Sequence, residues 1–199
     1  MVAVMGVVLL LMAGGVRVLT GSPAQARKSA TDTLISWIEQ ARTCAITTRS
    51  IVVLAIAEPG DLAFNDARCH IGILKINEWP ADPDTLDGTL IQRWQSLPAG
   101  VVIIPGAVNG IRNPRDEPEV TIRYRAGNQL VQGRFHILAF NRRGGLLWPG
   151  GADPLALRIA EGAYRNNQPS PNTRNTKPNI AENHLQIGRH IGRPYRTDG

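Results

Sequence analysis

The C-terminal end of this sequence holds the side chains that could most directly do chemistry. Three arginines, Arg189, Arg193 and Arg196, are interleaved there with His190 and Tyr195. A guanidinium matches the geometry of a phosphate, and an aromatic ring can stack on a nucleobase. The three arginines are therefore candidate DNA contacts, and a solvated basic tail is the alternative interpretation.

The charge balance of the whole chain points in the same direction. Lys and Arg number 22 against 16 Asp and Glu, which gives a net charge of +6. Such an excess favours acidic partners, namely phospholipid head groups, nucleic acid or an acidic protein face. A basic surface that is simply solvated is the alternative.

Sequence patterns of the common enzyme classes are absent. The chain has no G-x-S-x-G, no phosphate-binding Walker loop, no H-E-x-x-H and no EF-hand loop. The four histidines are scattered without the spacing of zinc ligands. We therefore expect no catalytic residues, no cofactor and no metal ion, and we predict that the protein is not an enzyme.

The two cysteines, Cys44 and Cys69, are too few to form a disulfide scaffold. A single bridge between them would be compatible with an exported domain. The sequence does not show whether the two cysteines lie close together in the fold. Both interpretations, a disulfide bridge and two free thiols, therefore stay open.

An apolar segment opens the chain and carries no charge before Arg17. Nineteen helical residues would reach roughly 28 Å, about the thickness of a hydrocarbon core. We therefore predict a transmembrane or filament-core segment over residues 1–22. A signal peptide cleaved near residue 26 is the alternative. The predicted anchor residues are Val2, Val4, Val7, Val8, Leu9, Leu10, Leu11 and Val16.

A helix is predicted over residues 23–49 because its apolar residues recur at intervals of three and four. Charged side chains occupy the opposite face of the same stretch. Pro23 suits the first position of a helix. The apolar face consists of Ala26, Ala30, Leu34, Trp37, Ile38, Ala41, Cys44, Ala45 and Thr48.

Short apolar or alternating runs after this helix predict a β-sheet. Together with the helix they define a globular domain over 23–165, followed by a flexible loop or linker over 166–183 and a C-terminal strand and basic tail over 184–199. The predicted strands of the domain span residues 51–57, 69–76, 90–98, 100–106, 120–126, 135–141 and 155–164.

Several segments resemble the GspH/FimT group of type IV pilin-like proteins, and they occur in the order typical of that group. The resemblance rests on Trp37–Ile46, on Trp94–Ile103 with its W-x-x-L-P-x-G-V pattern, on Phe140–Gly145, and on Gly188-Arg189 and Gly192-Arg193. The basic leader, cleavage glycine and glutamate of the group are missing. We expect a start upstream of Met1, a trimmed chain or a degenerate relative.

The resemblance implies an α+β fold in which a long N-terminal helix, membrane-embedded in its first half, packs on an antiparallel β-sheet. It implies a minor pilin or pseudopilin of a type II secretion or type IV pilus-like machine, assembling through its N-terminal helix. Its partners would be other pilin or pseudopilin subunits, inner-membrane lipid, and secreted substrate proteins or DNA. The expected location is the bacterial inner membrane, single-pass, with the globular domain in the periplasm or outside the cell.

Two other functions stay open at this stage. Some FimT-type proteins bind DNA through a C-terminal Gly-Arg-x-Arg motif, which segment 192–196 resembles with one extra residue between its arginines. A DNA-binding minor pilin of DNA uptake is therefore one alternative. An exported enzyme with a cleaved signal peptide is the other.

Overall fold

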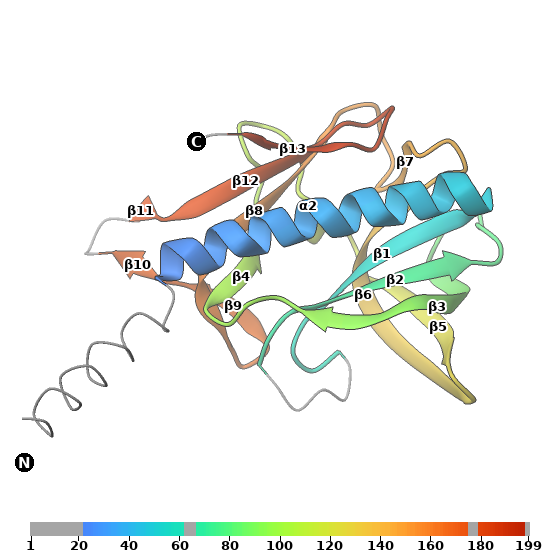
Figure 1. Ribbon diagram of the computed structural model, residues 1–199, viewed down its shortest axis with the longest axis horizontal. Helices are drawn as coiled ribbons and strands as arrows, with labels where there is room; N and C mark the ends of the chain where they lie inside the picture. The colour runs from blue at the N-terminus through green and yellow to red at the C-terminus, as the bar shows by residue number, and fades with distance from the viewer. Residues whose placement is uncertain (1–21, 62–66, 175–178, 198–199) are drawn as a thin grey trace, which may run out of the picture.

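The computed structural model describes residues 22–61, 67–174 and 179–197, and it consists of one helix followed by strands (Figure 1). The helix is α2, Pro23–Thr48, and a single 3-10 turn, η1, spans Pro114–Asp116. The strands are β1 Ile51–Ala57, β2 His70–Ile76, β3 Thr85–Ser96, β4 Val101–Ile104, β5 Val120–Ala126, β6 Gln129–Phe140, β7 Leu146–Trp148, β8 Leu155–Arg165, β9 Gln168–Pro171, β10 Thr173–Arg174, β11 Asn179–Ile180, β12 Glu182–Ile187 and β13 Pro194–Thr197.

The helix predicted over 23–49 is confirmed by α2. The Ser22 hydroxyl caps its start by accepting a hydrogen bond from the Gln25 N–H at 3.2 Å. Its end is marked by Arg49 in the left-handed conformation, with φ of 48°. The buried face consists of Ala30, Thr31, Leu34, Trp37, Ile38, Ala41 and Ala45, close to the predicted stripe.

The first sheet closes on itself. Its strand order is β1-β2-β3-β5-β6, and β1 also pairs with β6, so these five strands form a ring with β7 attached to β6. All pairs in the ring are antiparallel except β3 with β5, which is parallel. The β5–β6 hairpin extends beyond the rest of the ring (Figure 1).

The second sheet has the order β13-β12-β8-β4, with β9 paired to the far end of β8. It lies on the same side of the first sheet as α2, and the helix runs across both sheets (Figure 1). Strands β10 and β11 form a small separate pair between β9 and β12.

Strand β1 divides the interior into two cores because successive side chains of a strand point to opposite faces. Val53, Ala55 and Ala57 point into the closed ring, where they pack with residues of β2, β3, β5 and β6. Val52, Leu54 and Ile56 point the other way, toward α2 and the second sheet. An apolar run such as 51–57 is what burial on both faces requires.

The first half of α2 is tied to the second sheet by polar contacts. The Arg27 guanidinium pairs with Glu161 of β8 at 2.7 Å and donates to the Asn183 side chain of β12 at 3.2 Å. Asn183 in turn donates to the Thr31 hydroxyl at 2.9 Å. The helix is thereby fixed in register on the sheet as well as packed against it.

The predicted fold class is wrong. We expected a long helix packed on one antiparallel, pilin-like sheet, whereas the described chain is mostly strand, in a closed ring with a parallel pair and in a second sheet. The reason is that apolar runs in the sequence show where strands lie but not which strands pair. The hydrophobic pattern therefore could not predict that the first sheet closes into a ring.

The predicted single-pass location in the bacterial inner membrane, with its transmembrane helix, is also corrected. In the part of the chain that the structure describes, no helix has both the length and the apolar character needed to cross a membrane. The predicted anchor residues, from Val2 to Val16, lie outside the described residues.

Most predicted strands are confirmed, with shifts of a few residues at their ends. Strand β3 begins earlier than predicted, and β6 begins at Gln129, because both continue beyond their apolar runs into exposed positions. The segment predicted as a loop or linker over 166–183 contains β9 and, in its described parts, β10 and β11. The predicted last strand is confirmed as β12, and β13 follows it.

Candidate functional site

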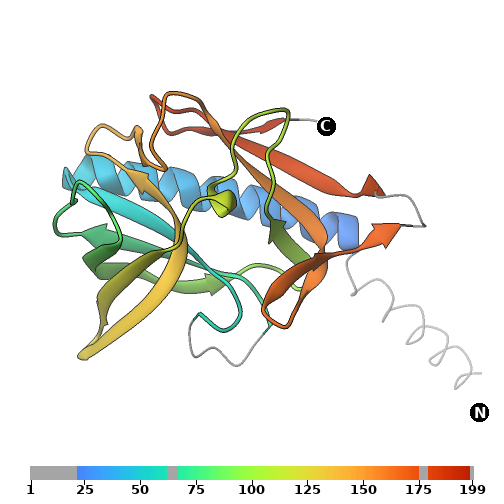
Figure 2. The same ribbon diagram turned by 180° about the vertical axis from the view of Figure 1, so that it is seen from behind.

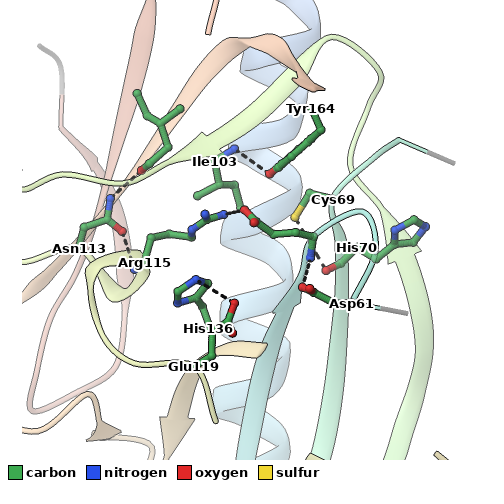
Figure 3. A network of polar contacts seen from close by, with 11 residues as sticks. Asp61, Cys69, His70, Ile103, Asn113, Arg115, Glu119, His136 and Tyr164 are labelled. Carbon is green, nitrogen blue, oxygen red and sulfur yellow. Dashed lines mark hydrogen bonds and ion pairs between the residues drawn. The ribbon is translucent and has the colours of Figure 1, made fainter. Parts of the chain in front are cut away.

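A network of polar side chains lies where the two sheets meet (Figure 3). Its centre is an ion pair between Glu58, which follows β1, and Arg115 of η1. Only 9% of the Glu58 side chain and 5% of the Arg115 side chain are exposed. We call this group, with Asp61, Cys69, Asn113, His136 and Tyr164, the buried junction.

Asn113 places Arg115 in the junction. Its side-chain oxygen accepts a hydrogen bond from the Arg115 N–H at 3.0 Å and so caps the 3-10 turn. Its side-chain nitrogen donates to the carbonyl of Ile104, at the end of β4, at 2.8 Å. The turn η1 contacts both β6 and β8, on the side of the sheets away from α2 (Figure 2). Arg115 therefore reaches β1 from a loop anchored to both sheets.

The two carboxyl groups of the junction are perturbed in the same direction. Burial raises the pKa of Glu58 above its ordinary value, and the charge of Arg115 and its hydrogen bond oppose that shift. Burial likewise raises the pKa of Asp61, whose carboxylate accepts a hydrogen bond from the Glu58 N–H at 2.6 Å. This contact folds the chain back after β1.

Cys69 and Tyr164 complete the junction as neutral groups. Burial raises the pKa of the fully buried Cys69 thiol to about 12. Burial also raises the pKa of Tyr164 well above its ordinary value, and the Tyr164 hydroxyl accepts a hydrogen bond from the Ile103 N–H at 3.4 Å. A thiol is nucleophilic as its thiolate, so Cys69 is held in its unreactive form at neutral pH.

His136 lies beside the ion pair, with its Nε2 atom 3.8 Å from Glu119. Burial and then the charge of Arg115 lower the pKa of His136, against the influence of Glu119. Within the described chain its Nδ1 atom has no hydrogen-bond partner. The imidazole is therefore neutral at physiological pH. With a protonated thiol, a neutral imidazole and a paired carboxylate, the arrangement is suited to joining the sheets rather than to attacking a substrate.

The structure separates the three arginines that we predicted as DNA contacts. Arg189 is buried, and its guanidinium donates to the carbonyls of Asp153 at 3.0 Å, Gly150 at 3.4 Å and Pro149. Burial lowers the pKa of Arg189. Arg193 and Arg196 are exposed, and the Nε atom of Arg193 lies 3.9 Å from Glu39 of α2. Only two of the three thus face solvent.

The two cysteines are both free. Cys44 is partly buried on α2, and Cys69 is fully buried just before β2. The bridge that the sequence left open is therefore not formed. Within residues 22–61, 67–174 and 179–197, no group of three or more His, Cys, Asp and Glu side chains could hold a metal ion.

Sequence reasoning missed the buried junction. The segment 112–119 is rich in charge, which predicted an exposed loop, yet Arg115 and Asn113 are buried within it. The available signal was the pair Asn113-Pro114, because an asparagine before a proline commonly starts a turn. Glu58 gave a second signal, as a carboxylate directly after an apolar strand requires a partner if it is buried.

Comparison with known proteins gives no further guide, since no protein-family model, no curated protein and no solved structure matches this chain.

Proposed function

We propose that this protein is a non-enzymatic minor subunit of a type II secretion or type IV pilus-like machine, of the GspH/FimT type that its motifs resemble. It works by binding other protein subunits. The observation that carries the proposal is the uncovered face of α2, which directly follows the apolar N-terminal run in the sequence.

The uncovered face lies along the first half of the helix. A shallow surface hollow of about 880 Å³ lies there, and all of its lining residues within the described chain belong to α2. Most of its lining residues are polar, and the small side chains of Ala24, Ser29 and Ser36 allow another helix or sheet to approach closely there. The lining residues are Ala24, Gln25, Lys28, Ser29, Asp32, Thr33, Ser36 and Trp37.

The opposite face of α2 supports the same function because it makes the helix a rigid part of the domain. Leu34, Ile38 and Ala41 are fully buried against the sheets. Arg27 adds the ion pair to Glu161, and Arg42 near the other end donates to the Ile191 carbonyl at 2.5 Å. A partner bound to the open face would thus hold the whole domain in a fixed orientation.

The segments that carry the resemblance have structural roles in keeping with this proposal. Leu97 of the W-x-x-L-P-x-G-V segment is fully buried, and Gly100 turns the chain with φ of 81° into β4. Phe140 is fully buried at the end of β6. These residues stabilise the fold of the domain, and binding to a partner would be made by residues on its surface.

Photo-crosslinking tests the proposal. We would place a photoreactive amino acid at the exposed position Ser36 of the full chain in its native cells and identify the adducts by mass spectrometry. We expect adducts with other subunits of a secretion or pilus machine. The matched control is the same group at Arg165, which is exposed at the end of β8. A chain that gives no subunit adducts from Ser36, or the same adducts from both positions, would contradict the proposal.

The DNA-binding alternative is less well supported. It was based on three arginines acting together, and the Arg189 guanidinium donates to backbone carbonyls inside the domain.

A further inference from the structure

A groove lies at the end of the closed sheet where α2 stops and β1 begins. It consists of two cavities of about 550 and 450 Å³ that share Ile51, Trp79 and Arg142. We call it the end groove. Its other lining residues are Arg49, Ser50, Lys75, Ile76, Asn77, Glu78, Asn141, Arg143 and Leu147.

The floor of the end groove is apolar. Ile51, Trp79 and Leu147 are partly buried, and they pack against the core inside the closed sheet. That core therefore reaches the surface at this end of the ring. An apolar side chain placed on the floor would extend the core and lose contact with water, which is favourable.

The rim of the end groove is basic. Arg49, Lys75, Arg142 and Arg143 are all exposed, and none of them makes an ion pair within the described chain. The part of the lining that the structure describes contains one carboxylate, Glu78. Elsewhere arginines such as Arg27 and Arg158 are paired with glutamates. Four unpaired cations beside one acid attract an anionic ligand.

The turn that carries two of these cations is already rigid. The Asn141 side chain accepts hydrogen bonds from the N–H groups of Arg143 at 2.8 Å and Gly145 at 3.2 Å. Gly144 has φ of 81°, and a Cβ atom there would lie only 2.7 Å from the Ile46 side chain of α2. The turn therefore packs closely against the helix. Because it is already ordered, less conformational entropy is lost when a ligand binds.

Arg49 adds a separate indication. It takes the left-handed conformation at the helix end, where glycine is the usual residue because a side chain is strained there. The position is exposed and borders the groove. A strained backbone at an exposed arginine is accounted for if its side chain binds the ligand of the groove.

We propose that the end groove binds an acidic peptide segment of a partner subunit. One apolar side chain of the peptide sits on the Trp79 floor, and carboxylates flanking it meet the four cations. This inference rests on the proposed function in one respect, namely that the partner is a protein. Among the described residues that line the groove, Trp79 is the one aromatic, whereas single-stranded nucleic acid requires successive stacking platforms. The groove therefore favours a peptide.

Fluorescence anisotropy with three labelled hexapeptides tests the proposal on the full chain in mild detergent. The probe is Glu-Asp-Leu-Phe-Glu-Asp. One control peptide, Glu-Asp-Ala-Ala-Glu-Asp, keeps only the charge, and the other, Gln-Asn-Leu-Phe-Gln-Asn, keeps only the apolar pair. We expect the probe to bind at least about tenfold more tightly than either control. Equal binding of the charge-only peptide would overturn the proposal.

Two variants locate the binding site. Arg142→Glu is expected to weaken probe binding by about tenfold or more, whereas Arg165→Glu, the same charge change at the other end of the molecule, leaves it within about twofold. Arg49→Gly removes a cation while relieving backbone strain, so its expected weaker binding cannot come from unfolding. Equal effects of Arg142→Glu and Arg165→Glu would overturn the proposal.

A deoxythymidine oligonucleotide provides the remaining comparison. Tighter binding of this strand than of the probe, with the same dependence on Arg142, would overturn the peptide assignment. Failure of the peptide with the Ser36 adducts intact would refute this inference and leave the proposed function standing. Peptide binding without those adducts would refute the proposed function alone.

Discussion

The buried junction and the end groove use the same residue types in opposite ways. In the junction, Arg115 and Glu58 are almost fully buried and each is the other's partner. In the groove, Arg49, Arg142 and Lys75 are exposed and have no ion-pair partner in the described chain. Burial makes a charge depend on its partner for stability, whereas exposure leaves a charge free to act on another molecule. The location of an arginine therefore separates its structural role from its binding role.

The largest expected effect comes from breaking the pair in the junction. Arg115→Met should lower the free energy of unfolding by about 3–5 kcal/mol, because it leaves the Glu58 carboxylate buried without a partner. The double variant Arg115→Met with Glu58→Leu should recover much of that loss, since it removes both charges. Urea unfolding followed by circular dichroism measures both. Equal losses in the single and double variants would show that the ion pair itself is not what stabilises the junction.

The next effect tests whether Arg189 belongs with the junction or with the exposed cations. Arg189→Ala should cost about 1–3 kcal/mol, because the carbonyls of Pro149 and Asp153 lose the Arg189 donor, whereas the Gly150 carbonyl keeps its hydrogen bond from Arg112. Arg193→Ala, four residues on and exposed, should change stability by less than about 0.5 kcal/mol. Thermal unfolding of the two variants side by side decides the question. If both variants change stability by similarly small amounts, Arg189 contributes no more to stability than an exposed arginine does.

A smaller effect of opposite sign is expected at the groove. Arg49→Gly should raise the free energy of unfolding by about 0.5–1 kcal/mol, because glycine adopts the left-handed conformation without the strain of a side chain. The expectation is a higher urea midpoint with an unchanged slope. If the variant is less stable than the parent, the Arg49 side chain stabilises the end of α2. The backbone strain at Arg49 would then no longer support a role in binding.

The smallest effect is a pH dependence from His136. Its pKa is lowered in the fold, so below about pH 6.5 the unfolded chain takes up a proton that the folded chain does not. Its contribution to stability is therefore complete above that pH and is lost as the pH falls toward the folded pKa. Glu58 and Asp61 act with the opposite sign, because their raised pKa values favour the folded state as they become protonated.

The difference in unfolding free energy between the parent and His136→Gln isolates the histidine from these carboxylates. Plotted against pH, this difference should be constant above about pH 6.5 and should turn against the parent on acidification. A flat difference across the whole range would mean that His136 titrates normally and lies outside the junction.

Local features of the fold were predictable from the sequence, and pairings between distant segments were not. The spacing of Leu34, Ile38 and Ala41 identified the buried face of α2, and the unbroken apolar run 51–57 identified a strand buried on both sides. The parallel pairing of β3 with β5 has no local signature, because a strand's side-chain period is the same in either pairing.

The sites were harder to predict for the same reason. Arg115 lies in a charged segment and Arg189 in a basic one, so composition predicted exposure for both, whereas tertiary contacts bury them. The end groove is assembled from the end of α2, the end of β2, the segment around Trp79 and the turn before β7. The end of β2 and Trp79 form one continuous stretch, 75–79, but the end of α2 and the turn before β7 lie far from it in the sequence, so no short window contains the whole groove.

The most direct test of the division between junction and groove is a titration of Arg142→Glu with the acidic hexapeptide, read together with its urea unfolding curve. The account predicts an unfolding free energy within about 0.5 kcal/mol of the parent and peptide binding weaker by about tenfold or more. Binding that is unchanged in this fully folded variant would contradict the account.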